Sequence, residues 1–505
     1  ADSSFSYGRT AFEFYNDDGL ALKNTQIFNM STGFIYYSPG PLKVSGCSLS
    51  DCGQGIWAHG EVQVDRSTFV DIGDFAIFVQ DSTLSVDNST FATVQCLAGH
   101  STMPTAAIIL NGTSPSGQIT NSVFNTTTPP VNYETAIYAV NGTLTVQNCS
   151  ISGLSESGIA TTDVHVAMTD SYLESTSVYL GGGAASVNNT QFIQTAIIFD
   201  EQVVSSNISY STFNATTTPM ALSQSYPFTV DHCHFTMIGM DASASHIMAT
   251  NLGDISISHC QFENMVASKA SSLSLSWPGT VKITNCDFLN NSFSGGFILA
   301  ISDAEGLALE NVTFAQAGDP DYITDYGIAC RNCSNITLTN VMLTELTFGV
   351  SIMRAEADDR ANQTILFQNV SAETITFQQP EPLMFNFTKY PQHTVADSTF
   401  TNCTSRNRDG VLFSATGYQL SDSIFTITGS QFTLGDRWLL LDNMSNIELT
   451  HSTVSQFQTI YFVVVQTGYY ESATSLNLTQ LEISDSSSDG FLFFMDVAEN
   501  IHVSG

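Results

Sequence analysis

Positive charge is scarce in this sequence of 505 residues. Lysine and arginine together number 13 against 47 aspartates and glutamates, so the formal net charge is -34 at pH 7. A surface of that sign repels phosphate, which excludes nucleic acid and an anionic bilayer surface as partners. Charged residues make up only 12% of the chain and hydrophobic residues 43%. The chain is therefore able to bury a large core and is not an acidic disordered segment.

Long apolar runs are absent as well. The longest strong run, residues 460–465, has six residues, whereas a helix needs about 20 apolar residues to cross a bilayer. We therefore expect no membrane insertion. The opening residues, Ala-Asp-Ser-Ser-Phe, have neither the basic nor the apolar region of a signal peptide. We expect any such peptide to have been removed already.

Acceptors for N-glycosylation are present in excess. The sequence has 32 asparagines and 117 serines plus threonines, and random placement of these would give about seven Asn-x-Ser/Thr triplets. The excess predicts secretion to the surface of a eukaryotic cell and covalent N-glycans. The alternative is that Asn and Thr are simply frequent in the turns of this fold. The 19 acceptors are Asn29, Asn88, Asn111, Asn125, Asn141, Asn148, Asn188, Asn207, Asn214, Asn290, Asn311, Asn332, Asn335, Asn362, Asn369, Asn386, Asn402, Asn443 and Asn477.

A short motif recurs along the whole chain. It consists of Asn, Asp or His, then a small residue such as Ser, Cys or Val, then a variable residue and a large apolar anchor. The clearest anchors are Phe69, Phe91, Phe124, Phe235, Phe262, Phe288, Phe314 and Phe400; weaker copies place Leu49, Ile151, Tyr172, Phe192, Phe213, Leu343, Phe432, Val454 and Ile483 there, and Ala372 is degenerate. The anchors are 20 to 33 residues apart.

Short alternating strands precede and follow each motif, and no segment keeps a helical period for twelve residues. Repeats of this length without crossover helices favour an all-β fold, a right-handed parallel β-helix, in which each repeat is one coil. We expect about 19 to 20 coils in a single domain covering residues 1–505, uncapped at both ends. A sandwich or propeller would show regular hairpin turns, which the sequence lacks.

The coils resemble a known superfamily. Tandem Phe-x-x-Asn coils with small-residue turns are similar to the parallel β-helix superfamily that contains pectin lyases, and to the repeats of polymorphic outer-membrane proteins. Phe288-Leu-Asn-Asn291 followed by Gly295-Gly296-Phe297-Ile298 is the best match, and Phe262-Glu-Asn264 is partial. The resemblance implies the fold and a surface location such as that of secreted protist and algal glycoproteins, but no activity.

A catalytic constellation is not apparent. Glycoside hydrolysis needs paired carboxylates on one face, and resemblance to polygalacturonases would imply an ordered Asp-Asp, His-Gly and Arg-Ile-Lys series. Asp358-Asp359 and His59-Gly60 occur far apart and in the wrong order, and Arg-Ile-Lys is missing. We therefore predict no enzyme, no catalytic residues and no cofactor, although Ca²⁺ among loop carboxylates stays open. A polysaccharide lyase or hydrolase is the first alternative.

Histidines and cysteines cluster without forming a convincing metal site. His232-Cys233-His234 and His259-Cys260 place their histidines in one position of the repeat and their cysteines in another. We predict a stacked Asn/His ladder along the turns and no metal. Cysteines in successive coils lie within reach of disulfide bonds but are equally able to stay free. The candidates for disulfides are Cys47, Cys52, Cys233, Cys260, Cys286, Cys330 and Cys333.

The two ends of the chain continue the repeat. Residues 1–5 match an ordinary motif and residues 501–505 match the strand that precedes one. We therefore predict a non-catalytic extracellular structural glycoprotein, a subunit or shaft of a fibre that self-associates head to tail through strand edges. A glycan- or receptor-binding adhesin using Tyr461, Tyr469 and Tyr470 is the second alternative. The predicted interface comprises Ala1, Asp2, Ser3, Ser4, Phe5, Ile501, His502, Val503, Ser504 and Gly505.

Overall fold

The computed structural model divides the chain into two compact units, residues 1–234 (unit 1) and 235–505 (unit 2), which are described separately. The described residues are 3–15, 18–94, 105–125, 135–154, 157–200, 202–215, 217–223, 226–237, 244–250, 253–268, 270–315, 324–357, 363–378, 383–405, 411–416, 423–435, 437–442, 444–456, 458–459, 463–466, 475–484, 487–488, 493–495 and 500–504.

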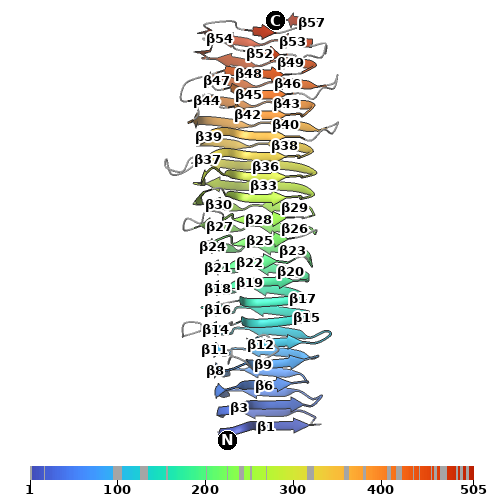
Figure 1. Ribbon diagram of the computed structural model, residues 1–505, viewed down its shortest axis with the longest axis vertical. Helices are drawn as coiled ribbons and strands as arrows, with labels where there is room; N and C mark the ends of the chain where they lie inside the picture. The colour runs from blue at the N-terminus through green and yellow to red at the C-terminus, as the bar shows by residue number, and fades with distance from the viewer. Residues whose placement is uncertain are drawn as a thin grey trace. The chain divides into compact units, whose positions relative to one another are not determined.

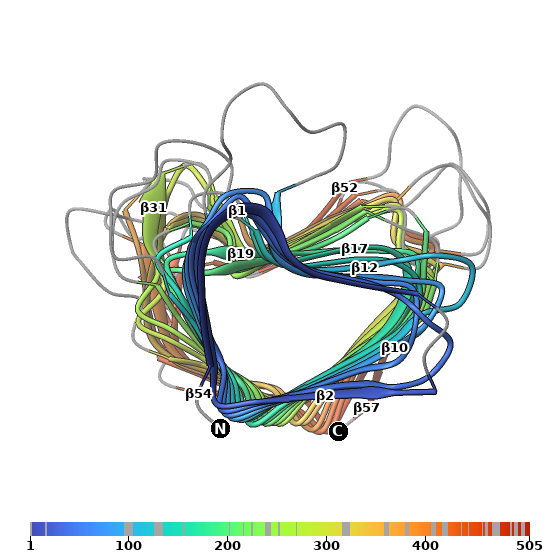
Figure 2. The same ribbon diagram turned by 90° about the horizontal axis from the view of Figure 1, so that it is seen from below.

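Each unit is a right-handed parallel β-helix, as the sequence predicts, and no helix occurs in the described parts of either. Every coil contributes strands to three ladders of parallel pairs, and the strands of each unit stack one above another (Figure 1). Seen along the axis, the strands of unit 1, drawn in blue to green, superpose into three faces (Figure 2). Within the described residues the first ladder holds ten strands in each unit.

In unit 1, long strands pass from one ladder to the next: β1 (Ser3–Tyr15), β3 (Thr25–Tyr37), β15 (Thr135–Gln147) and β17 (Ser157–Thr169). The first ladder also contains β2 (Leu20–Lys23), β4 (Leu42–Ser45), β7 (Val62–Asp65), β10 (Thr83–Asp87), β13 (Ser116–Thr120), β20 (Gly183–Asn188), β23 (Val203–Ser209) and β26 (Phe228–Asp231). The second contains β5 (Ser48–Cys52), β8 (Thr68–Ile72), β11 (Thr90–Val94), β14 (Val123–Asn125), β16 (Ser150–Ser152), β18 (Tyr172–Glu174), β21 (Gln191–Ile193) and β24 (Thr212–Ala215). The third contains β6 (Gln54–Ala58), β9 (Phe75–Gln80), β12 (Ala106–Asn111), β19 (Ser177–Gly181), β22 (Ala196–Phe199) and β25 (Met220–Ser223).

In unit 2, the long strands are β33 (Thr280–Leu289), β36 (Gly306–Ala315) and β39 (Met342–Glu356). The first ladder also contains β29 (Ile255–Ser258), β38 (Asn335–Thr339), β40 (Thr364–Gln368), β43 (Gln392–Ala396), β46 (Ile424–Thr428), β49 (Asn446–Thr450), β53 (Ser475–Thr479) and β57 (Asn500–Ser504). The second contains β27 (His234–Met237), β30 (Gln261–Glu263), β41 (Ser371–Phe377), β44 (Thr399–Ser405), β47 (Gln431–Gly435), β50 (Thr453–Ser455) and β54 (Glu482–Ser484). The third contains β28 (Ile247–Thr250), β32 (Ser271–Ser276), β35 (Phe297–Ser302), β37 (Thr324–Arg331), β42 (Leu383–Thr388), β45 (Val411–Thr416), β48 (Arg437–Asp442), β52 (Val463–Gln466) and β56 (Phe493–Met495), and short pairs are formed by β31 (Val266–Ser268) with β34 (Ser292–Ser294) and by β51 (Gln458–Thr459) with β55 (Ser487–Ser488).

The corners between ladders are made by single residues with positive φ. Asn121, Asn148 and Asp170 end successive first-ladder strands of unit 1 with φ of 51°, 50° and 51°. Asn and Asp tolerate this left-handed conformation better than other non-glycine residues. The polar first residue of the repeated motif is therefore the corner that turns the chain from the first ladder into the second.

Anchor side chains stack inside unit 1. The rings of Phe69 and Phe91 lie 5.0 Å apart with planes 4° from parallel, and Phe124 stacks on Phe91 at 4.7 Å. The prediction that Tyr172 is an anchor is wrong. The register places Leu173 against Ile151, so Leu173 is the inward-facing anchor and Tyr172 lies on the outer side of the strand. The corner in that coil is Asp170, and the residue three positions after a corner points inward.

The small residue after each first-ladder corner forms an internal hydrogen-bonded row. The backbone N–H of Ser67 donates to Ser89 Oγ at 3.2 Å, and that of Ser89 donates to Ser122 Oγ at 3.2 Å. Cysteine takes the same position in other coils, where the backbone N–H of Cys260 donates to Cys286 Sγ at 3.4 Å. The cysteine position seen in the sequence is thus a variant of a buried serine row.

No helix in the described parts of the chain is long and apolar enough to span a membrane. The single domain predicted for residues 1–505 stays a prediction.

Candidate functional site

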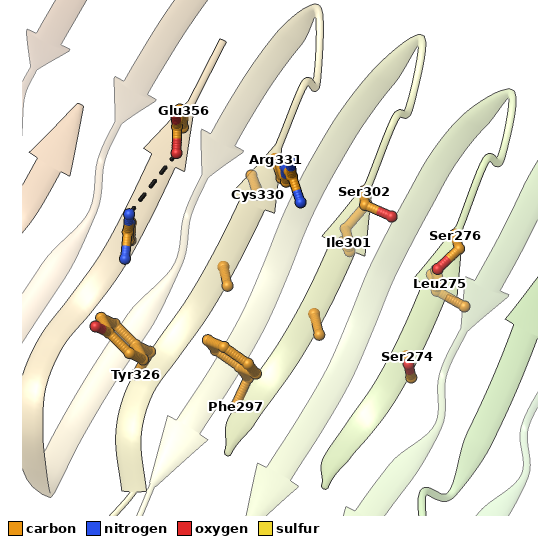
Figure 3. A pocket seen from close by; sticks show the side chains of 13 residues that line it. Ser274, Leu275, Ser276, Phe297, Ile301, Ser302, Tyr326, Cys330, Arg331 and Glu356 are labelled. Atoms are coloured by element: carbon orange, nitrogen blue, oxygen red, sulfur yellow. Dashed lines mark ion pairs between the residues drawn. The ribbon is translucent and has the colours of Figure 1, made fainter. Parts of the chain in front are cut away.

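A trough of about 480 Å³ lies on the outer face of the third ladder in unit 2. Strands β32, β35, β37 and β39 form its base, and all pair in parallel. Side chains alternate between the two faces of a strand, so Leu275, Ile301 and Cys330 point into the core while their neighbours point outward. Figure 3 shows the residues that line it.

Small side chains form the floor of the trough. Ser274, Ala300 and Ala329 occupy equivalent positions on β32, β35 and β37, because the register pairs Ser274 with Ala300 and Ala300 with Ala329. Larger side chains stand on both sides of this row. The difference in side-chain size makes the hollow, with no break in the sheet.

Two stacked aromatic rings form one wall. Phe297 and Tyr326 are paired on neighbouring strands, and their rings lie 5.3 Å apart with planes 23° from parallel. Figure 3 shows both rings standing side by side above their strands. Their partners on the flanking strands, Ser271 and Ser351, carry no ring. The outer faces of the stack are therefore not covered by further aromatic residues of this row.

Polar and charged side chains form the other wall. Ser276, Ser302, Arg331 and Glu356 lie in one row across the four strands. Arg354 Nη2 lies 3.7 Å from Glu356 Oε2, an ion pair of half-exposed side chains, marked by the dashed line in Figure 3. Arg331 is exposed and has no ion pair among the described residues. Two of the 13 cationic residues of the chain thus line one hollow.

Beneath the floor, Cys330 and Cys333 interact through their thiols. The hydrogen bond to Cys333, followed by burial, raises the pKa of Cys330 well above its ordinary value, whereas accepting that bond lowers the pKa of Cys333. Cys330 is fully buried and stays protonated at neutral pH. It therefore offers no nucleophile to the trough, because the thiolate is the reactive form.

The trough offers few groups for acid–base chemistry. Glu356 is the one carboxylate among the described residues that line it, and Arg354 holds it in an ion pair. Hydrolysis of a glycoside needs two carboxylates, and an arginine stays protonated in proteins. The arrangement is suited to binding: rings on one side, cations and hydroxyls on the other.

Sequence reasoning did not find this site. Arg331 lies in the Cys330-x-x-Cys333 segment, of which the sequence suggested only the two thiols as disulfide candidates, and Glu356 lies two residues before Asp358-Asp359. Asp358-Asp359 falls outside the described residues, as do Tyr461, Tyr469 and Tyr470. No local spacing signals the trough, because its walls come from residues one coil apart.

The predicted Asn/His ladder is present at the first-ladder corners. In unit 2, Asn285 Nδ2 lies 3.1 Å from His259 Nε2, and Asn311 Nδ2 donates to Asn285 Oδ1 at 2.9 Å. In unit 1, the ring of His232 stacks on Tyr210 at 4.7 Å, and its Nδ1 lies 2.8 Å from Asp231 Oδ2. His232 and His259 thus occupy first-ladder corners, where they contact neighbouring side chains.

The described cysteines are free thiols in this structure and all are buried. Cys47 and Cys233 hydrogen-bond to backbone carbonyls two residues before them, Ser45 and Asp231, at 3.5 and 3.3 Å. Cys52 does the same with Ser50 at 3.2 Å. The disulfides proposed for Cys47, Cys52, Cys233, Cys260, Cys286, Cys330 and Cys333 stay a prediction.

The N-glycosylation acceptors fall partly on corners. Asn362 and Asn443 lie outside the described residues. Nine of the other acceptors have positive φ, which is the conformation that selects asparagine at a corner. The fold therefore accounts for part of the excess of these triplets, and glycosylation stays a prediction. The nine are Asn29, Asn88, Asn141, Asn148, Asn290, Asn311, Asn332, Asn369 and Asn402.

The predicted end interface is described only in part. Ser3, Ser4 and Phe5 open β1, and Phe5 pairs with Ile27 in the anchor row. Val503 pairs with Leu478 in the first ladder. Ala1, Asp2 and Gly505 lie outside the described residues. End-to-end association stays a prediction.

Comparison with known proteins agrees with the fold. A family model described as a right-handed beta helix region matches residues 1–114. No curated protein matches the chain. Two solved structures, the PL6 family alginate lyase AlyGC and a mutant of it, each align with 99% of this chain and 97% of their own at 10% identity and a TM-score of 0.26. The resemblance to parallel β-helix proteins is confirmed as a resemblance of fold, and a similarity of this size carries no argument about activity.

Proposed function

We propose that this chain is an extracellular glycoprotein of the parallel β-helix fold that binds an acidic glycan in the trough of unit 2 without cleaving it. The observation that carries the proposal is the pairing of an aromatic stack, Phe297 and Tyr326, with an exposed cation, Arg331, across a floor of small side chains. Such a site has the non-catalytic character expected from the sequence.

The dimensions suit a short stretch of polysaccharide. Tyr326 and Arg331 are five positions apart along β37, which is roughly 16 Å in an extended strand. Strands β32, β35 and β37 span two inter-strand steps, about 10 Å. A ligand of two or three sugar rings fills such a space, and the floor leaves room because Ala300 and Ala329 end at Cβ.

The chemistry of the walls selects sugar and negative charge. An aromatic ring presents a flat apolar face that packs against the C–H groups of a pyranose, while its polar edge stays hydrated. A guanidinium binds a carboxylate through two parallel hydrogen bonds. Arg331 has no ion pair among the described residues, so a ligand carboxylate gains a partner there without displacing another one.

The experiment is a calorimetric titration of the full chain with oligosaccharides of galacturonic, guluronic and glucuronic acid, and with neutral oligosaccharides of the same length. We expect binding of at least one acidic series. Arg331→Gln should weaken it about tenfold or more, because a charge-assisted hydrogen bond contributes about 1.5–3 kcal/mol. Tyr326→Ala should weaken it through loss of the ring.

Lys282→Gln is the matched control. Lys282 is an exposed cation of unit 2 on β33, outside the trough, with a loose ion pair to Glu310 at 4.0 Å. The Lys282→Gln variant should bind the acidic oligosaccharides with unchanged affinity. Equal losses in the Lys282 and Arg331 variants would reduce the effect to net charge and contradict the proposal. Appearance of cleaved products during the titration would favour the lyase or hydrolase alternative.

Self-association into a fibre is a second candidate. The register supports it within each unit, because Phe5 of β1 stands in the anchor row and β57 stands in the first ladder. In a head-to-tail stack, β57 of one copy would therefore pair with β2 of the next copy, and β54 with β1, which keeps the repeat in phase. Electron microscopy of the secreted protein tests this candidate, which predicts long fibres; single particles at all concentrations would exclude it.

A further inference from the structure

Glycosylation acceptors occur inside a hydrogen-bonded row of side-chain amides in unit 2. Asn311 Nδ2 donates to Asn285 Oδ1 at 2.9 Å, Asn340 Nδ2 donates to Asn311 Oδ1 at 2.8 Å, and Asn369 Nδ2 donates to Asn340 Oδ1 at 2.7 Å. All four residues are corners with φ near 53°, and their side chains are exposed. Asn311 and Asn369 each begin an Asn-x-Ser/Thr triplet and are candidate sites of N-glycosylation, whereas Asn285 and Asn340 do not begin such a triplet.

The same contact occurs in unit 1. Asn148 is also a candidate site of N-glycosylation, and its Nδ2 donates a hydrogen bond to Asn121 Oδ1 at 2.7 Å. In each case the donating amide reaches the corner of the preceding coil. A sugar attached to Asn148, Asn311 or Asn369 would therefore sit on a nitrogen that already has a structural role.

The two hydrogens on Nδ2 of Asn311 have different surroundings. Its Oδ1 accepts from Asn340 on one side along the axis, and its Nδ2 donates to Asn285 on the other. A carbonyl oxygen and an N–H that point in opposite directions are anti to each other across the C–N bond. The N–H anti to Oδ1 is thus the one in the row, and the other N–H is left outside it.

Substitution of an amide nitrogen has a strong geometric preference. A secondary amide keeps its remaining N–H anti to the carbonyl oxygen, because the opposite arrangement is less stable by about 2.5–4 kcal/mol. The glycosylated side chain is such an amide. The sugar carbon therefore replaces the N–H that is not in the row, and the anti N–H that Asn311 donates to Asn285 is retained.

We propose that the corner row is a set of preformed N-glycan attachment sites, at which Asn148, Asn311 and Asn369 carry glycans and keep their side-chain hydrogen bonds. Nδ2 loses one proton and forms a bond to the first sugar carbon, while the bond from that carbon to its lipid-linked pyrophosphate carrier breaks and the released pyrophosphate takes up the proton. Glycans on Asn311 and Asn369 stand two coils apart, about 10 Å. The inference rests on the secretory setting of the proposed function.

The test uses the full chain secreted from a eukaryotic host. Mass spectrometry measures occupancy at each acceptor, and thermal unfolding compares variants. Thr313→Val removes the glycan from Asn311 but keeps the Asn311 amide. Thr337→Val is the control, because it does the same at Asn335, whose side chain takes part in the structure as a hydrogen-bond acceptor: its Oδ1 accepts from Thr364 Oγ1 at 3.0 Å. We expect Asn311 to be glycosylated and the two variants to shift the unfolding midpoint equally.

A second pair of variants isolates the hydrogen bond. Asn311→Asp removes the glycan and the donor, and it turns a carboxylate oxygen toward Asn285 Oδ1. Asn335→Asp removes a glycan and adds the same charge but keeps its acceptor. We expect Asn311→Asp to lower the unfolding midpoint by about 2 °C more than Asn335→Asp, because it removes the Nδ2 hydrogen bond to Asn285 Oδ1 and leaves that oxygen without its donor.

Two outcomes would overturn the inference. The first is an unmodified Asn311 in protein that is glycosylated at Asn335. The second is a higher thermal unfolding midpoint for the Thr313→Val variant than for the Thr337→Val variant. The second would show that the glycan strains the row. A secreted protein without glycan at any acceptor would instead overturn the secretory setting as well, while glycan binding in the trough is measured independently by titration.

Discussion

The backbone N–H of Cys149 donates to the hydroxyl oxygen of Ser171, 3.2 Å away in the following coil, and Cys149 stands where Ser171 stands in its own coil. Its thiol donates to the carbonyl oxygen of Gln147 at 3.3 Å, as the Ser171 hydroxyl does to Thr169 at 2.8 Å. Cysteine and serine thus perform one structural task in this row.

Replacement of Cys149 by serine should therefore be tolerated. We expect Cys149→Ser to change the free energy of unfolding by less than about 1 kcal/mol. Cys149→Ala removes the donor to Gln147 and should destabilise by about 1 kcal/mol more than the serine variant. Urea denaturation of both variants measures the difference, and equal stability of the two would contradict a hydrogen-bonding role for the thiol.

The thiol of Cys149 should also be chemically quiet. Burial raises its pKa to about 11, so at pH 8 the reactive thiolate is rare. We expect alkylation of Cys149 in the native protein to be limited by unfolding and to be rapid in denaturant without any reductant. A requirement for reductant before labelling at Cys47, Cys52, Cys233, Cys260, Cys286, Cys330 or Cys333 would instead support the disulfides proposed from the sequence.

A buried histidine should make unit 2 sensitive to acid. His393 is 1% exposed and packs between the rings of Phe387 and Phe425 at 5.5 and 5.7 Å. Burial lowers its pKa to about 3, against about 6.5 in an unfolded chain. Between these values the unfolded state binds a proton that the folded state does not, so stability falls as the pH drops below about 6.5.

The loss at pH 4 should approach about 3 kcal/mol, and His393→Leu should remove it. His451→Asn is the control, because His451 is an exposed corner residue. Urea denaturation at pH 7 and pH 4 measures both variants. If the leucine variant lost as much stability on acidification as the parent, His393 would not be the group responsible.

The anchor rings of unit 2 should contribute strongly to stability. Phe262 stacks on Phe235 and Phe288 at 4.9 and 4.8 Å and is fully buried. Phe262→Ala should cost about 3–5 kcal/mol through loss of burial and the cavity left behind. Phe262→Leu should cost much less, because Leu343 holds the same position in another coil.

Hydrogen exchange distinguishes local from global effects of these anchor variants. In a repeat fold each coil contacts only its neighbours, so the Phe262→Ala defect should be concentrated in the coils next to it. Uniform loss of protection across unit 2 would show instead that the unit unfolds as one cooperative block.

One corner should be open to improvement. Trp277 has φ of 60° and its side chain is 62% exposed, whereas Asn332 and Asp303 hold equivalent third-ladder corners. A left-handed conformation costs an ordinary residue about 1–2 kcal/mol, and asparagine less. Trp277→Asn should stabilise unit 2 by about 0.5–1 kcal/mol. Trp277→Ala, which removes the ring but keeps the strain, should not, and a gain with alanine would assign the effect to the ring.

Much of the coil could be read from the sequence because its rules are local. A polar residue that tolerates positive φ, a small residue and an inward anchor lie within four positions, so the pattern around Phe69, Phe91 and Phe124 shows where the chain turns and what it buries. The reading failed by one residue at Tyr172, where an aromatic side chain looked like the anchor. Successive side chains of a strand point to opposite faces, so an error of one residue in the predicted anchor exchanges the inner and outer faces.

The sequence by itself determined the architecture, since every coil repeats the same few local preferences and stacking them buries one continuous core. Only the tertiary structure decided where a ligand could bind. The side chains of the trough walls come from three successive coils and from no repeated pattern: Phe297 lies on β35, Tyr326 and Arg331 lie on β37, and Arg354 lies on β39. They form one trough because the rise of one coil, about 4.8 Å, places outward side chains that are more than twenty residues apart within contact of the same ligand.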